Sequence, residues 1–163
     1  MNTWELFNSL KKETECFSIE DIAGKIDTAE HPPGSPRYLS GMIASYDLQA
    51  LIEIRNGDPP ETVEEVDTGQ LDDFRSRIDS YMDQYAPGQP DLRRYIRAVS
   101  TYLAFIAGKP LHPPGMVTAG GQSIVGRGGD YFCPMKRRQL HKHLSLCQYC
   151  VSKEIGAMGD DSA

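Results

Sequence analysis

Long apolar runs are missing from this 163-residue sequence, and their absence sets a first limit on its function. A helix that crosses a bilayer needs about twenty consecutive apolar residues. The longest apolar stretch, residues 102–107, has the length of a buried helix end. The first residues, Met1-Asn-Thr-Trp-Glu5, contain neither the basic nor the apolar part of a secretory signal. We therefore expect a cytoplasmic protein with no membrane partner.

Cysteine is scarce as well, with four residues in the whole chain. Thiols in the cytosol are normally kept reduced, and a chain of this length buries enough surface to fold without crosslinks. Two structural disulfides are therefore not expected. Metal binding, redox chemistry and simple burial remain as roles for the four thiols.

Positive charge is in deficit over most of the chain. Residues 1–126 contain eleven Lys and Arg against nineteen Asp and Glu, a net charge of −8, whereas residues 127–163 contain six against four, a net charge of +2. An acidic body repels nucleic-acid phosphates, yet the C-terminal part can contact an anion locally. We therefore expect a protein or an anionic ligand as the partner, with nucleic acid as the disfavoured alternative.

Apolar residues recur at helical spacing from the start of the chain. A short helix is predicted after Thr3, with Trp4, Phe7 and Leu10 on its apolar face. A second short helix is predicted next, because Ser18 has the side chain and position of a helix N-cap.

Three longer amphipathic helices follow in the sequence. They are predicted near residues 36–55, 71–85 and 91–108, with Ser35 opening the first and Asp91 capping the last. Together with the two short helices they predict a mainly α-helical protein in which residues 1–108 form a helical bundle.

The composition changes after residue 108, where glycine and proline become frequent. A short β-hairpin is predicted between residues 123–125 and 131–133, because five turn-forming residues separate these two runs. We therefore expect a small Cys/His metal-binding module over residues 109–156. The small acidic tail of residues 157–163 is predicted to fray.

Three of the four cysteines lie in that module with the spacing of a metal site. Cys147-Gln-Tyr-Cys150 places two thiols on one tight turn, and Cys133 lies fourteen residues before Cys147. Tetrahedral zinc needs a fourth ligand, for which the sequence offers four candidates: Cys16, His112, His141 and His143.

The four candidates differ in their local surroundings. Cys16 stands beside an expected helix cap and is typical of a buried small apolar residue. His141 and His143 lie among helix formers and fit the surface of a short basic helix. His112 begins a His-Pro-Pro-Gly turn, in which two prolines restrict the backbone near the imidazole.

Four motifs of the module resemble the C-terminal signature of a known family. They are Leu111-His-Pro-Pro-Gly115, Gly120-Gly121, Tyr131-Phe-Cys-Pro-Met-Lys136 and Leu146-Cys-Gln-Tyr-Cys150. The family is an uncharacterised one of methanogenic archaea, domain of unknown function 2115, and the resemblance covers about the last fifty residues. It implies His112 as the fourth ligand beside the three cysteines, and an archaeal cytoplasm. It implies no established activity.

A structural zinc site of Cys3His type is therefore the leading hypothesis, within a binding or interaction protein. An iron-sulfur cluster and a thiol redox function of Cys147 and Cys150 are alternatives. A nucleic-acid-binding zinc module is another, with Lys136, Arg137, Arg138, Lys142 and Lys153 contacting phosphates and Tyr131, Phe132 and Tyr149 stacking on bases.

No catalytic group is predicted from the sequence. A zinc deaminase needs His-x-Glu or Cys-x-Glu before a Pro-Cys-x-x-Cys motif. Neither string occurs here, and Leu146 precedes Cys147 where that motif has proline. The sequence therefore favours a protein that is not an enzyme.

Overall fold

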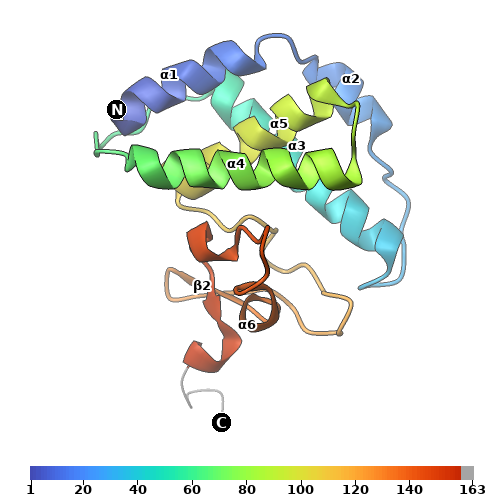
Figure 1. The fold of residues 1–163 in the computed structure, drawn as a ribbon. Helices are drawn as coiled ribbons and strands as arrows, with labels where there is room; N and C mark the ends of the chain where they lie inside the picture. Colours follow the sequence, from blue (N-terminus) through green and yellow to red (C-terminus); the bar gives the residue numbers. More distant parts are fainter. Residues whose placement is uncertain (159–163) are drawn as a thin grey trace.

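Five α-helices occupy the first two thirds of the chain, and a small module with little regular structure follows them (Figure 1). The computed structural model describes residues 1–158. The helices are α1 (Thr3–Thr14), α2 (Ile19–Lys25), α3 (Pro36–Asn56), α4 (Thr68–Tyr85) and α5 (Pro90–Tyr102). The prediction of a mainly helical protein is confirmed. In the described part of the chain, no helix has the length and apolarity that a membrane crossing requires.

Side chains at the helix starts explain where these helices begin. Asn2 and Glu5 cap α1 reciprocally, each side chain accepting a 2.9 Å bond from the other's backbone N–H. Ser18 and Ser35 cap α2 and α3 as predicted. The predicted cap at Asp91 is wrong, because the helix already begins at Pro90, whose fixed φ suits a first helical position.

The main core lies where α1, α3 and α5 meet. Leu6, Phe7 and Leu10 of α1 are at most 1% exposed, and Leu51 of α3 is fully buried. The expectation that Trp4 faces this core is wrong, since its side chain is 48% exposed. The buried stripe of α1 is centred on Leu6 and Leu10, which leaves Trp4 outside the contact with α3 and α5.

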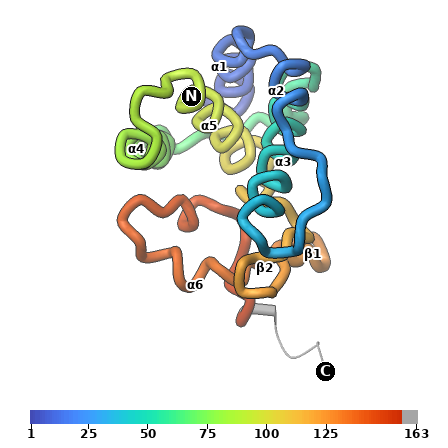
Figure 2. The backbone as a smooth tube through the Cα atoms, turned by 90° about the vertical axis from the view of Figure 1, so that its right-hand side faces the viewer, coloured from blue at the N-terminus to red at the C-terminus, as the bar shows by residue number. Residues whose placement is uncertain are grey.

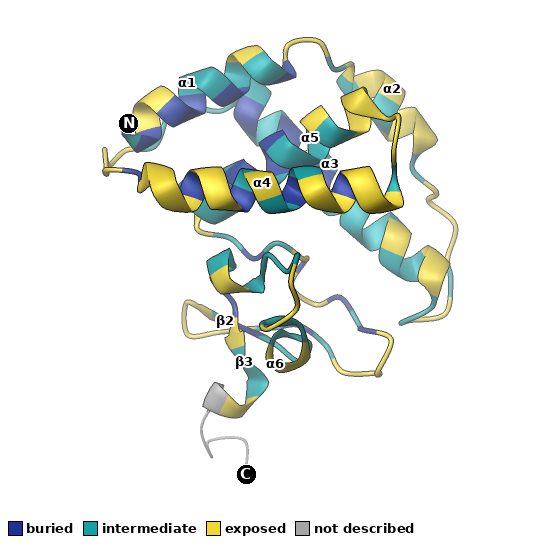
Figure 3. Ribbon diagram, in the orientation of Figure 1, coloured by how far each residue is buried: buried dark blue, intermediate teal, exposed yellow. Residues whose placement is uncertain are grey.

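A second apolar cluster joins α4 to the module. Phe74, Ile78 and Met82 form its buried part, as Figure 3 shows by the dark stripes on the otherwise exposed α4. Phe105 packs on it from the π-helix η1 (Leu103–Ala107), which continues α5. Leu111, Leu146 and Tyr149 of the module pack on it from the other side. The C-terminal third of the chain is thus attached to α4 by apolar contact.

The module contains a three-stranded sheet in the order β1, β2, β3. β1 (Val125–Arg127) and β2 (Asp130–Cys133) pair antiparallel around Gly128 and Gly129, whose φ values of 60° and 85° a tight hairpin turn requires. This confirms the predicted hairpin. β3 (Lys153–Glu154) adds to β2 in parallel and was not predicted, because two residues carry no alternating pattern.

Three short helical segments complete the module: α6 (Lys136–Gln139), η2 (Cys147–Tyr149) and η3 (Ile155–Met158). In Figure 2 the chain from α6 onward lies below α4, and the hairpin lies below α3. Of the tail predicted to fray, residues 159–163 lie outside the described part of the chain.

Hydrogen bonds from α3 hold the first loop of the module. The Tyr46 hydroxyl donates to the carbonyl of Pro110 at 2.8 Å, and the backbone N–H of Val117 donates to the Tyr38 hydroxyl at 3.0 Å. Lys109 bonds to Glu53 at 2.9 Å. The predicted boundary at residue 108 is thus crossed by many contacts, and independent folding of residues 109–156 stays a prediction.

Gly34 lies where the turn before α3 approaches the module, and its replacement by alanine tests that contact. Its φ is +80°, and a Cβ atom would lie 2.7 Å from the carbonyl oxygen of Thr118. We expect Gly34→Ala to lower the free energy of unfolding by about 1–3 kcal/mol, measured by urea denaturation. As a control, Gly24→Ala in α2 meets open space and is expected to raise it by about 0.5–1 kcal/mol. Equal effects of the two changes would contradict the approach.

Candidate metal site

The three cysteines of the predicted site lie at the ends of two short elements. Cys133 is the last residue of β2, while Cys147 opens η2 and Cys150 follows it. The turn between the latter two is closed by a 3.2 Å bond from the Cys150 N–H to the Cys147 carbonyl. All three side chains are partly buried.

Cys133 interacts electrostatically with the other two thiols. Burial raises the pKa of its thiol, and the neighbouring Cys150 and Cys147 raise this pKa further. The backbone N–H groups of Met135 and Lys136 hydrogen-bond to Cys133 and oppose that rise. Such donors stabilise the thiolate over the thiol, and the thiolate is the form that binds metals.

Cys150 receives a backbone donor from the His-Pro-Pro-Gly turn. The N–H of Leu111 lies 3.4 Å from the Cys150 sulfur, which places His112 one residue from that contact. Desolvation lowers the pKa of the His112 imidazole, although its side chain is exposed, and water reaching the ring limits that effect. At pH 7 the ring is neutral, which is the state that binds a metal.

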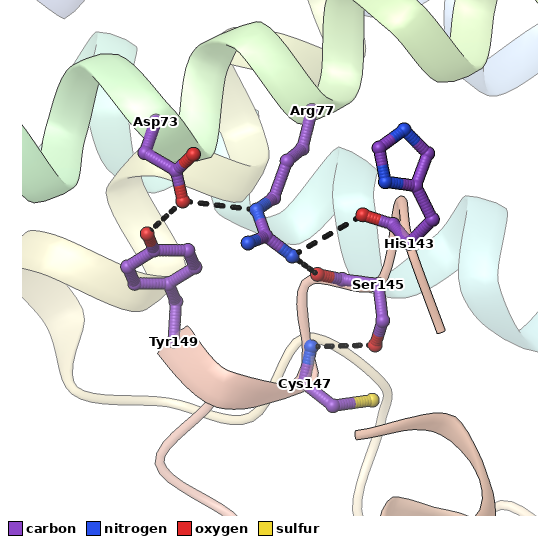
Figure 4. A network of polar contacts seen from close by, with 6 residues as sticks. All are labelled: Asp73, Arg77, His143, Ser145, Cys147 and Tyr149. Carbon is purple, nitrogen blue, oxygen red and sulfur yellow. Dashed lines mark hydrogen bonds and ion pairs between the residues drawn. The ribbon is translucent and has the colours of Figure 1, made fainter. Parts of the chain in front are cut away.

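Arg77 of α4 holds the loop that precedes Cys147 (Figure 4). Its Nη1 donates to the carbonyl of Ser145 at 3.0 Å and to that of His143 at 3.4 Å. Its Nε donates to Asp73 at 2.9 Å. The loop is thereby fixed to a helix more than sixty residues earlier in the chain.

Tyr149, between the paired cysteines, is held by the same helix. Its ring packs edge-on against Phe74, with 5.4 Å between ring centroids, and its hydroxyl donates to Asp73. Phe132 is 6% exposed. Both aromatic side chains therefore pack inside the protein, which leaves little of either ring for the base stacking considered from the sequence.

Lys136 also has a structural contact in place of a surface position. Its Nζ donates to the carbonyls of Cys150 and Ser152, the first at 3.0 Å. It thus ties the cysteine turn to α6. Arg137, Arg138 and Lys142 are exposed and remain able to contact an anion.

The other candidates for fourth ligand are placed less favourably than His112. Cys16 lies between α1 and α2, a connection on the far side of the bundle from the module (Figure 1), and Arg94 donates to its sulfur at 3.6 Å. The His143 imidazole points away from the Cys147 sulfur (Figure 4). His141 is exposed on the turn after α6.

The four predicted ligands are neighbours without being gathered into one tight set. Among residues 1–158, no three side chains of the types His, Cys, Asp and Glu meet closely enough to hold a metal ion. The ligand set therefore stays a prediction. Sequence reasoning missed Arg77 and Asp73, for which the only signal was an i, i+4 charge pair of the kind common on solvated helices.

Comparisons with known proteins place these features in one family. A family described as an uncharacterised protein conserved in archaea, domain of unknown function 2115, matches residues 2–155. The similarity thus extends over the helices, beyond the last fifty residues in which the sequence motifs suggested it.

Several relatives are named UPF0305 proteins and span nearly their whole length in the comparison. One of Methanocaldococcus jannaschii is 35% identical over 161 residues, 95% of this chain and 98% of the relative. One of Methanococcus maripaludis is 29% identical, covering 97% and 100%. One of Methanothermobacter thermautotrophicus is 27% identical, covering 93% and 96%. No solved structure matches the chain.

Proposed function

The chain belongs to the archaeal family of domain of unknown function 2115, and we propose that within this family it is a zinc-stabilised interaction protein. Its module holds the ion in a structural Cys3His site formed by Cys133, Cys147, Cys150 and His112. Four protein ligands fill the tetrahedral coordination of zinc, so no position is left open for a substrate.

One observation carries this proposal: two of the three sulfurs accept backbone N–H donors from separate segments. Met135 and Lys136 serve Cys133, and Leu111 serves Cys150. A buried free thiol has little need of such donors, whereas a thiolate is stabilised by them. Their convergence on one region supports a site for a metal that prefers thiolate ligands.

The composition of the module supports a structural role for the ion. Its buried apolar core includes Met116, Ile124 and Phe132, and much of its remaining length is glycine, proline and charged residues. Bonds between thiolates and zinc supply folding free energy that so small a core lacks. Because the ligands are not gathered tightly, entry of the ion is expected to draw them together.

Metal analysis of the protein purified without chelators tests this function. We expect about one equivalent of zinc per chain, with Cys16 as the one thiol that reacts rapidly with a thiol reagent. Chelation should then release the zinc and expose the other three thiols. Much less than one equivalent, with all thiols reactive at once, would overturn the proposal.

The same preparation, made under anaerobic conditions, separates the alternatives. A brown protein containing iron and sulfide would replace zinc with an iron-sulfur cluster. Disulfide exchange that Cys147→Ser abolishes, while the metal content stays unchanged, would favour a thiol redox function instead.

For the partner we propose a protein or an anionic ligand in the archaeal cytoplasm. The exposed Arg137, Arg138 and Lys142 support an anionic contact, and the −8 charge of residues 1–126 counts against nucleic acid. Binding of RNA and DNA measured against salt concentration decides between the two, because phosphate contacts produce a steep salt dependence.

A further inference from the structure

We propose that Arg77 and Asp73 of α4 are positioning residues for the proposed zinc site, through which the helical bundle sets the metal affinity of the module. This inference rests on the proposed zinc site and adds how the site is controlled. Neither residue is a proposed ligand, and all four proposed ligands lie outside α4. The two side chains act on the backbone between residues 143 and 149, which presents Cys147 and Cys150.

The geometry of the Arg77 guanidinium uses two of its nitrogens for two tasks. Nη1 donates to the carbonyls of Ser145 and His143, while Nε donates to Asp73, which lies one helical turn earlier on α4. Asp73 therefore fixes the plane of the guanidinium, and that plane fixes the loop. A lysine carries its donors on a single nitrogen and cannot span the carboxylate and both carbonyls in this way.

The grip on Ser145 reaches Cys147 directly. Besides its carbonyl contact with Arg77, Ser145 accepts a 3.1 Å hydrogen bond on its hydroxyl from the Cys147 N–H (Figure 4). Asp73 reaches the same turn from its other end, because it accepts the Tyr149 hydroxyl. The turn that carries two of the three thiols is thus held at Ser145 and at Tyr149 by one carboxylate and one guanidinium.

An ordinary surface ion pair does not account for these contacts. The pair of Asp73 and Arg77 alone would be the familiar i, i+4 pair of a solvated helix, with little effect on the rest of the protein. Here the Arg77 side chain is 23% exposed and also bonds to carbonyls 66 and 68 residues further along the chain. The guanidinium also lies over the Tyr149 ring, 5.9 Å from its centroid.

Thermodynamic linkage makes the effect reciprocal. If the contacts of Arg77 favour the loop geometry that binds zinc, then bound zinc must strengthen those contacts by the same factor. Zinc is therefore expected to slow amide hydrogen exchange in α4, although the helix provides none of the ligands. That coupling distinguishes positioning from a general contribution to the stability of the fold.

The test compares zinc affinity in Arg77→Met, Arg77→Lys and a matched control by chelator competition. Affinity is expected to fall about 10–100-fold in both Arg77 variants, the range typical of groups that orient metal ligands. The control is Arg93→Met, which removes an ion pair between α5 and Asp83 of α4, outside the loop contacts. Its affinity is expected to stay within about twofold of the wild type.

Two further measurements on the same proteins isolate the positioning role. Cobalt(II) bound in place of zinc should give the same thiolate charge-transfer bands in the wild type and in Arg77→Met, since the ligands are unchanged. Zinc should slow exchange of the α4 amides in the wild type and in Arg93→Met but much less in Arg77→Met. Circular dichroism confirms that each variant is folded, and Arg77→Lys carries the test if Arg77→Met does not fold.

The outcomes separate this inference from the proposed function. A wild type that binds no zinc overturns the site itself. A wild type that binds zinc, with Arg77→Met binding equally well, leaves the site standing and overturns the positioning role. Wild-type affinity in Arg77→Lys would overturn the claim that the fork of the guanidinium is needed.

Discussion

Replacing Cys150 by serine is expected to lower the zinc affinity of the protein by more than about 100-fold. Loss of a group that only orients a ligand costs about 10–100-fold, and loss of the ligand itself exceeds that range. The serine hydroxyl is not ionised at neutral pH, and it gives zinc a much weaker bond than a thiolate does. The N–H of Leu111 would also lose its sulfur acceptor.

The matched control for this change is Cys16→Ser. Cys16 is the fourth cysteine of the chain and lies beside Arg94 in the helical part. We expect Cys16→Ser to bind zinc as the wild type does, measured by chelator competition with a colorimetric zinc indicator. Equal losses in the two variants would instead favour Cys16 as a ligand, and unchanged affinity in Cys150→Ser would contradict the site.

Replacing Asp47 by asparagine is expected to raise the free energy of unfolding at pH 8 by up to about 4 kcal/mol. Asp47 lies on α3 with 8% of its surface exposed, and burial raises its pKa from 3.8 to about 7. A difference of about three pH units between the folded and unfolded states corresponds to about 4 kcal/mol of free energy. Asparagine has the same shape and no charge, so it avoids the desolvation of a carboxylate.

The sign of the pH dependence follows from the direction of this shift. Between about pH 4 and pH 7 the folded state holds the Asp47 proton and the unfolded state has lost it, so a rise in pH favours unfolding. The penalty is complete above pH 7 and absent below pH 4. Wild type and Asp47→Asn should therefore be equally stable near pH 4 and diverge up to pH 7.

Urea denaturation at several pH values measures this divergence. Asp58→Asn, at an exposed position in the loop after α3, is the matched control and should follow the wild type throughout. A constant difference between wild type and Asp47→Asn from pH 4 to pH 8 would show that the carboxylate is not the cause.

Much of the helical body was predictable because its signals are local. The apolar spacing located the longer helices, and the serine caps at residues 18 and 35 were identified from side-chain chemistry alone. The hairpin before Cys133 followed from turn residues between two apolar runs. The cap at Asp91 failed because Pro90 begins the helix one residue earlier.

The candidate site divides along the same line. Spacing alone selected Cys133, Cys147 and Cys150, since two thiols on a tight turn with a third at a suitable distance are a local pattern. Arg77 and Lys136 could not be found in this way, because their contacts join residues 14 to 68 positions apart. On the sequence they look like solvated cations.

By itself, the sequence determined the mainly helical body, the hairpin and the choice of three thiols, because each depends on residues close together in the chain. The tertiary structure decided which side of each helix is buried, and so exposed Trp4 and buried Asp47. It also decided that α4 holds the cysteine turn. That contact arises from packing between elements distant in sequence, where many pairings satisfy the same local pattern and only the assembled core selects one.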